Sequence, residues 1–180
     1  VLIVSSGDPG VFAMAAAVFE VLERDAERWQ EIDIEVLPGV TAMLAAAARA
    51  GAPLGHDFCV INLSNNLKTW DTIEKRLMLA VDADFAMAFY NPRSTSRPSE
   101  FEKTIHLLKT YCQEERLVIF ARAVSTEQEA IRIVPLSQIE ADMADMRTIV
   151  IIGSSQTRIV KQSQKEWVYT PRSYPFSESQ

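Results

Sequence analysis

The sequence of 180 residues is short of cysteine, histidine and positive charge, and it lacks a long apolar run. Its two cysteines, Cys59 and Cys112, are too few for a disulfide framework and are not spaced like metal ligands. Both are predicted to be reduced thiols of a cytoplasmic protein. The net charge of −6 argues against a nucleic-acid partner, because such partners need a basic face. No signal peptide or membrane-spanning run is recognised, so no membrane association is predicted.

No lysine follows the first glycine-containing turn, SSGDPG at residues 5–10, so a nucleotide- or phosphate-binding loop is a weak interpretation of this turn. The β-branched run at residues 1–4 predicts a buried strand before it. Asp8 is a good N-cap, and Pro9 a good first residue, for a helix over residues 11–22. Small ligands bind at such strand–turn–helix junctions in α/β sheets, and glycine lets them approach the backbone. An ordinary capped turn explains the pattern equally well.

A second junction of this kind follows at PGVTA, residues 38–42. Residues 32–37 alternate partly between apolar and polar side chains and predict a strand. Residues 43–50 are almost all alanine and predict a helix, with Thr41 as its N-cap. The chain opens inside a predicted strand, and these two strands are too few for a stable sheet. The N-terminal part of this first domain is therefore expected to be missing.

GAPLG at residues 51–55 is the predicted domain boundary. Beyond it, strands are predicted over residues 58–63, 84–90, 117–121, 130–134 and 148–152, and helices over 67–81, 100–112 and 137–143. Thr69 is a predicted helix cap, and Ser99 with Glu102 forms a predicted capping box. Since the later strands follow one another with little helix between them, the second sheet should be mixed. The predicted α/β architecture is thus a partial first domain at 1–51, a second domain at 52–155 and an irregular tail at 156–180.

Four motifs then occur in order, at residues 6–12 (SGDPGVF), 38–42 (PGVTA), 51–58 (GAPLGHDF) and 90–94 (YNPRS). Together with GSSQTR at 153–158 and TPR at 170–172, they resemble the tetrapyrrole methylases over nearly the whole chain. The resemblance implies the end of a first α/β domain and a complete second one with a mixed sheet. It also implies that S-adenosylmethionine binds in the cleft between them. The family's usual glycine-rich first motif has no counterpart here, so this chain alone is expected to bind the cofactor weakly and to turn over nothing.

The resemblance further implies which residues contact S-adenosylmethionine. They are Gly7, Asp8, Val11, Thr41, Ala42, Asn91 and Ala123. A carboxylate and a hydroxyl suit the amino-acid end and the ribose of this cofactor, and apolar side chains suit its adenine. Ala123 stands where many relatives have glycine, which would narrow the adenine slot. No metal site is expected.

The tetrapyrrole substrates of this family carry carboxylates, which an acidic protein must meet with local arginines. Arg93 and Arg97 follow the cofactor-binding strand and are the predicted substrate-binding residues. Arg122, like Arg158 and Arg172, is interpreted as a surface residue. His56 is a candidate proton acceptor. A hinge histidine bonded to the backbone is the favoured interpretation, however, and no catalytic base is assigned.

Within the family, the motifs look most like the branch of cobalamin biosynthesis that methylates C-17 of precorrin-3B, or of its cobalt form, and contracts the ring. The sequence leaves two alternatives open. One is a sister methylase that acts at another carbon of the macrocycle. The other is a truncated, non-catalytic domain that only dimerises or binds a partner. The resemblance implies a homodimer.

Overall fold

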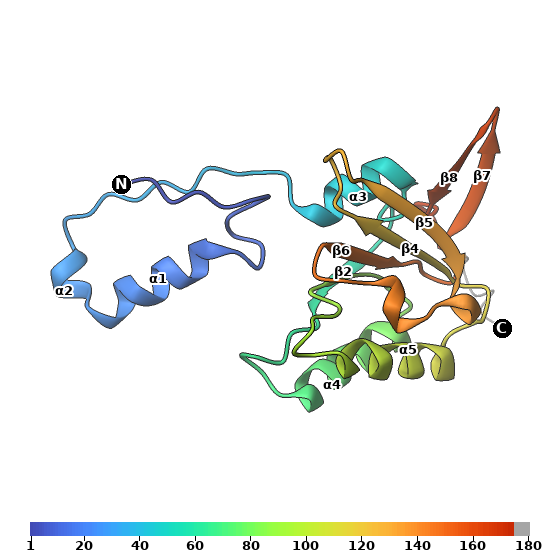
Figure 1. Ribbon diagram of the computed structural model, residues 1–180, viewed down its shortest axis with the longest axis horizontal. Coiled ribbons are helices and arrows are strands. Elements are labelled where there is room, and N and C mark those ends of the chain that lie inside the picture. The colour runs from blue at the N-terminus through green and yellow to red at the C-terminus, as the bar shows by residue number, and fades with distance from the viewer. Residues whose placement is uncertain (175–180) are drawn as a thin grey trace.

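The computed structural model describes residues 1–174, and its body is built on a mixed five-stranded sheet (Figure 1). The strand order is β2 (Phe58–Asn62), β3 (Ala86–Tyr90), β6 (Thr148–Ile152), β4 (Leu117–Arg122) and β5 (Ala130–Pro135). β2 and β3 are parallel, and the other neighbours are antiparallel. The prediction of a mixed sheet is therefore confirmed, together with the five strands that compose it.

Helices cover both faces of this sheet. α4 (Trp70–Asp82) and α5 (Ser99–Tyr111) pack on one face, and α3 (Ala42–Ala50) packs on the other. Successive residues of a strand point to opposite faces, so Met87 and Phe89 of β3 join the first core while Ala88 joins the second. Every residue of β6 is buried, as expected for a strand covered on both faces.

The predicted helix caps had different outcomes. Thr69 caps α4 as predicted, because its side chain accepts a hydrogen bond from the Thr72 backbone N–H at 3.4 Å. The capping box of α5 is wrong: Ser99 lies inside the helix, and the cap position is Pro98. The short helix expected near residues 137–143 is two 3₁₀ turns, η1 (Leu136–Gln138) and η2 (Ala141–Met143).

The segment predicted to be an irregular tail instead forms a second sheet. β7 (Arg158–Gln162) and β8 (Lys165–Tyr169) make an antiparallel hairpin, and β8 pairs in parallel with β1 (Gly51–Ala52). Val168 is the one fully buried side chain of the hairpin. Because the other side chains of the hairpin are wholly or partly exposed, its sequence shows little of the apolar–polar alternation that predicts a strand. The final six residues of the predicted tail, 175–180, lie outside the described part of the chain.

Residues 1–40 extend away from the body and contain α1 (Met14–Arg24) and α2 (Ala26–Trp29) (Figure 1). The strands predicted over residues 1–4 and 32–37 are not formed. A strand needs a hydrogen-bonded neighbour, and within residues 1–174 neither segment has one. The first helix begins at Met14, three residues later than predicted, and Asp8 does not cap it. Many apolar side chains of this segment are exposed, among them Leu2 and Leu37.

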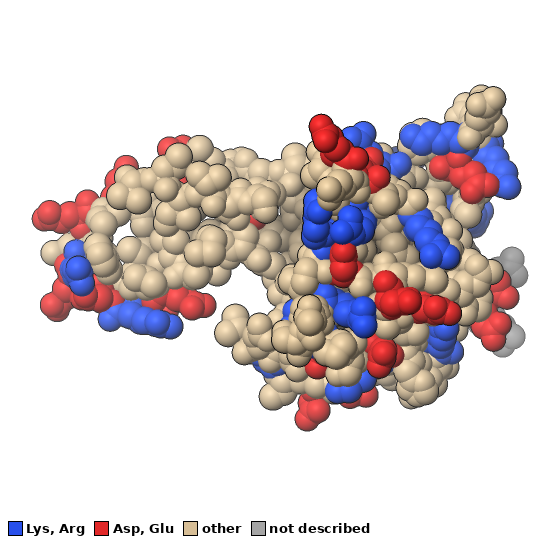
Figure 2. Space-filling view, viewed as in Figure 1, with Lys and Arg blue, Asp and Glu red and all other residues tan. Residues whose placement is uncertain are grey.

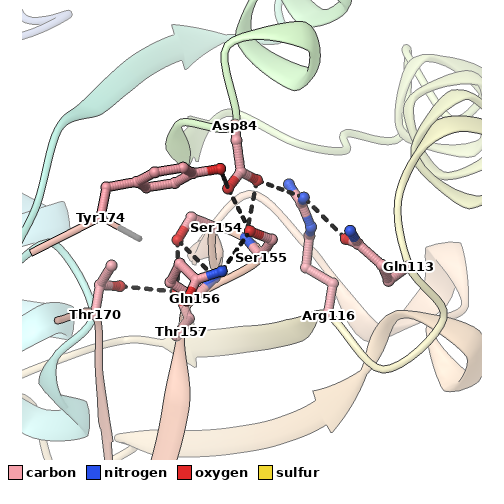
Figure 3. Close-up of polar contacts among 9 residues, drawn as sticks. All are labelled: Asp84, Gln113, Arg116, Ser154, Ser155, Gln156, Thr157, Thr170 and Tyr174. Carbon is pink, nitrogen blue, oxygen red and sulfur yellow. Dashed lines mark hydrogen bonds and ion pairs between the residues drawn. The ribbon is translucent and has the colours of Figure 1, made fainter. Parts of the chain in front are cut away.

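A polar cluster around Asp84 fastens the hairpin and the C-terminal segment to the sheet (Figure 3). The Asp84 carboxylate accepts hydrogen bonds from the backbone and hydroxyl of Ser155, from Tyr174 and from Arg116, whose nitrogen lies 2.6 Å away. Burial raises the pKa of Asp84, but the hydrogen bonds from Ser155 and the charge of Arg116 outweigh it and hold this pKa below its usual value. Thr170 adds a further link by donating to the Pro53 carbonyl oxygen at 2.6 Å.

Two further findings concern the described residues as a whole. None of their helices has the length and apolar character that crossing a membrane requires. Residues 1–174 also contain no group of three or more histidine, cysteine or acidic side chains arranged to hold a metal ion.

Cys59 and Cys112 are both free thiols, and burial raises the pKa of Cys59 to about 11.

Candidate functional site

A cavity of about 630 Å³ opens at the edge of the large sheet where β3 and β4 end and β6 begins. Five stretches of chain form its wall, and they lie within residues 5–13, 40–45, 90–91, 121–125 and 146–149. The volume lies in the usual range for small-molecule sites. Its position at the carboxyl end of the parallel strand β3 agrees with the place where α/β sheets bind ligands.

The cavity gathers six of the seven residues predicted to contact the cofactor. They are Gly7, Asp8, Val11, Thr41, Ala42 and Asn91. The seventh, Ala123, does not line the cavity, but the next two residues, Val124 and Ser125, do. Residues that are more than 80 positions apart in the sequence thus meet in one wall.

Asp8 joins the first two motifs instead of capping a helix. Its Oδ1 accepts a hydrogen bond from the Gly10 backbone N–H at 2.8 Å, and its Oδ2 accepts one from the Gly39 N–H at 3.1 Å. The two turns lie so close that a Cβ on Gly39 would stand 2.2 Å from the carbonyl oxygen of Gly7, whose φ is +76°. This approach requires glycine at position 39, and the left-handed backbone favours glycine at position 7.

Tyr90 connects the second motif to the end of β3. Its hydroxyl forms a hydrogen bond with Thr41 Oγ1 and accepts another from the Met43 backbone N–H at 3.0 Å. Thr41 holds the N-cap position of α3, as predicted, but its side chain bonds Tyr90 and does not cap the helix. The Tyr90 ring also packs against Phe12, with 5.1 Å between ring centroids. One side chain therefore fixes three parts of the cavity wall.

The backbone around the cavity contains several left-handed residues. Among residues 1–174, six non-glycine residues have positive φ, and four of these lie in or beside the wall: Phe12, Asn91, Ala123 and Ser125. Such conformations cost energy and concentrate at functional sites. Two of them are fixed by neighbours: the Asn91 amide donates to Asn62 Oδ1 at 3.2 Å, and the Ala123 N–H donates to the Arg147 carbonyl oxygen at 2.9 Å.

The predicted substrate arginines do not line the cavity. Arg97 is buried, with one guanidinium nitrogen 3.5 Å from the Asn91 carbonyl oxygen and the other 3.7 Å from Met146 Sδ. Asn91 and Met146 both line the cavity, so Arg97 supports the wall. Arg93 has a buried Nε with no hydrogen-bond partner within residues 1–174.

His56 lies away from the cavity. It precedes β2, whose first residue pairs with Ala86 at the beginning of β3, whereas the cavity adjoins Tyr90 at the other end. Four residue steps along a strand span about 13 Å. The His56 Nδ1 accepts a hydrogen bond from the next backbone N–H at 2.7 Å. The structure therefore gives His56 no contact with the cavity and supports the interpretation of a hinge residue bonded to the backbone.

Among the wall residues that the sequence did not predict are Met146 and Arg147, which belong to a turn between η2 and β6. Asp145 shapes this turn by accepting hydrogen bonds from the Arg147 backbone N–H at 2.9 Å and from Thr148 Oγ1 at 2.7 Å. Burial raises the pKa of Asp145, but hydrogen bonds from Thr148 and Arg122 outweigh it and lower this pKa overall. No local motif marks the turn, because its importance comes from its place beside β3.

The fold and cavity define an α/β protein with a cavity of small-molecule size between turns that are distant in the sequence. Comparison with known families identifies the family within this class. Residues 1–140 match the family model Tetrapyrrole (Corrin/Porphyrin) Methylases, and the chain therefore belongs to this family of methyltransferases. The predicted resemblance is confirmed.

Several known proteins are similar to this chain. Precorrin-3B C(17)-methyltransferase of Sinorhizobium sp. is 51% identical over 175 residues, which cover 97% of this chain and 69% of the relative. Probable cobalt-factor III C(17)-methyltransferase of Salmonella typhimurium is 37% identical over 176 residues, with shares of 97% and 69%. Both relatives are thus matched over about two thirds of their length.

Solved structures of methyltransferases also superpose on this chain. The crystal structure of the methyltransferase CobJ superposes with a TM-score of 0.87 at 57% identity, covering 93% of this chain and 68% of that one. Uroporphyrin-III C-methyltransferase of Thermus thermophilus, complexed with S-adenosyl homocysteine, superposes with a TM-score of 0.56 at 20% identity, covering 82% and 62%. The second match shows the fold alone.

Proposed function

We propose that the protein transfers a methyl group from S-adenosylmethionine to C-17 of precorrin-3B, or of its cobalt form, and contracts the ring in cobalamin biosynthesis. One observation carries the proposal: the three motifs at residues 6–12, 38–42 and 90–94 meet in a single cavity. The Sinorhizobium and Salmonella relatives, which are named for C-17 methylation, support this choice of carbon.

The cavity suits S-adenosylmethionine by the groups that it offers. Ser5, Ser6 and Thr41 bring hydroxyl groups, and Asp8 brings a carboxylate, for the amino-acid end and the ribose. Apolar residues such as Val11 offer a wall for adenine. The bound cofactor would supply a methyl group already activated on a positive sulfur. The residues of this chain then have to bind it, exclude water and align the accepting carbon with the carbon–sulfur bond.

Other predictions stay proposals. Arg93 and Arg97 are the proposed substrate arginines. The buried Arg93 Nε, which has no hydrogen-bond partner within residues 1–174, supports this for Arg93, whereas the buried Arg97 would act through the wall residues Asn91 and Met146 that it contacts. In the full-length protein, Arg93→Ala should raise the KM for the tetrapyrrole and leave the KM for S-adenosylmethionine unchanged. The reverse result would assign Arg93 to support of the loop. A homodimer in the cytoplasm also remains a proposal, which sedimentation and localisation would test.

The function itself is tested by turnover. The full-length protein is incubated with methyl-labelled S-adenosylmethionine and either precorrin-3B or its cobalt form, and the product is analysed by mass spectrometry and by NMR. We expect the label at C-17 of a contracted macrocycle. Label at another carbon would identify a sister methylase, and tight binding of S-adenosyl homocysteine without turnover on either substrate would contradict the proposed reaction.

A further inference from the structure

The cavity wall contains two charged side chains among the described residues, Asp8 and Arg147. Both oxygens of Asp8 already accept backbone hydrogen bonds from the turns that it joins. The side chain of Arg147 bonds the neutral amide of Gln128, with 2.6 Å between Nη1 and Oε1. The negative charge of the wall thus has two backbone N–H groups as partners, whereas the positive charge of Arg147 has a single neutral side chain as its partner.

The neighbouring arginines differ from Arg147 in this respect. Arg122 Nε lies 2.8 Å from the Asp145 carboxylate, and Arg49 Nε lies 3.1 Å from the Glu129 carboxylate. Within residues 1–174, no ion pair joins the Arg147 guanidinium to a carboxylate. Figure 2 shows Lys and Arg side chains spread over this face of the body, one group of them on the side toward the N-terminal segment, with Asp and Glu side chains between them. Arg147 is thus an uncompensated cation at the edge of the site.

We infer that Arg147 binds a peripheral carboxylate of the tetrapyrrole substrate. This inference rests on the proposed function. A guanidinium with an unpaired charge favours an anion, and a planar carboxylate can accept two of its N–H groups at once. The other ligand of the cavity, S-adenosylmethionine, has a single carboxylate beside its own ammonium group, and its sulfonium leaves it with a net positive charge, so the macrocycle with its several carboxylates is the better match for a guanidinium. Arg147 therefore selects and orients the macrocycle and leaves the binding of S-adenosylmethionine to the remaining wall.

The main test is Arg147→Gln in the full-length protein. The variant should fold, because Arg147 holds its turn through the backbone N–H and carbonyl oxygen, which the substitution keeps. We expect the KM for the tetrapyrrole to rise about five- to tenfold, as for a charged contact that is partly solvated. The KM for S-adenosylmethionine should not change. Arg147→Lys should restore only part of the loss, since lysine cannot make the two-pronged contact.

A second variant keeps Arg147 and gives its guanidinium a negatively charged partner within the protein. Gln128→Glu would place a carboxylate at the position of the present amide, 2.6 Å from the Arg147 guanidinium, where it would compete with the substrate. It should raise the tetrapyrrole KM as Arg147→Gln does, because the new ion pair would occupy the guanidinium that the substrate carboxylate needs. Arg132→Gln is the matched control, because this exposed arginine of β5 does not line the cavity.

The outcomes separate the inference from the proposed function. If the parent protein turns over the tetrapyrrole but Arg147→Gln and Gln128→Glu keep the parent KM, the role of Arg147 is wrong and the function stands. A rise in the KM for S-adenosylmethionine would also overturn the inference, since the bound carboxylate would then belong to the cofactor. If the parent protein neither binds nor methylates the tetrapyrrole, the proposed function and this inference both fail.

Discussion

Asp8 offers a quantitative test of how the cavity is assembled. Its carboxylate is the polar link between the first two motifs, through the N–H groups of Gly10 and Gly39. A hydrogen bond to a charged group contributes about 1.5–3 kcal/mol when buried and about 1 kcal/mol or less near solvent. Both bonds of Asp8 are solvent-exposed, so the two together should contribute about 2 kcal/mol, of which most is lost in Asp8→Ala.

The assay is calorimetric titration of the full-length protein with S-adenosyl homocysteine. If binding requires the two turns to be joined, the free energy lost in Asp8→Ala is also lost from binding. The affinity of this variant for S-adenosyl homocysteine should then fall by about tenfold to thirtyfold. Asp8→Asn should lie between the parent and Asp8→Ala, because an amide has a single acceptor oxygen and no charge. Asp33→Ala is the matched control, since it removes one exposed carboxylate from the same segment.

Two results would refute this reasoning. An unchanged affinity in Asp8→Ala, together with a lower melting temperature, would show that the link stabilises the fold but does not position the ligand. An equal loss of affinity in Asp33→Ala would show that the effect is one of overall charge. In either case the contact between the turns would not determine binding.

Three further predictions concern the same architecture. Gly39→Ala should abolish binding of S-adenosyl homocysteine in calorimetry, because its Cβ would stand 2.2 Å from a backbone oxygen, whereas Gly10→Ala, with 3.3 Å to a flexible carboxylate, should be tolerated. Tyr90→Phe keeps the aromatic contact but leaves the Met43 N–H without its acceptor, and denaturant unfolding should show a loss of about 1–2 kcal/mol. Asp84 has a lowered pKa in the folded protein, so its carboxylate stabilises the fold above about pH 4 and loses this effect as the pH falls through the folded pKa. Thermal unfolding should therefore show a smaller acid-induced loss of stability in Asp84→Asn than in the parent, and an equal loss would contradict the role of the cluster.

The sequence predicted most of the body because the signals there are local. The apolar runs of β3 and β6, the periodic pattern of α4 and α5, and the cap at Thr69 each depend on residues within one element. The motifs also predicted six of the residues that line the cavity, because each motif keeps its residues together in one turn. Arg147 escaped notice because its turn contains no such motif.

Tertiary structure decided the features that depend on partners far along the chain. Residues 1–4 and 32–37 have strand-like sequences but form no strand, because within residues 1–174 nothing pairs with them. β7 has a weak pattern, yet it is a strand because β8 bonds it on one side. Asp8 looks like a helix cap, but it bonds Gly39, 31 residues away. A side chain's local sequence limits which bonds it can make, and the arrangement of the whole chain determines which of those partners comes within reach.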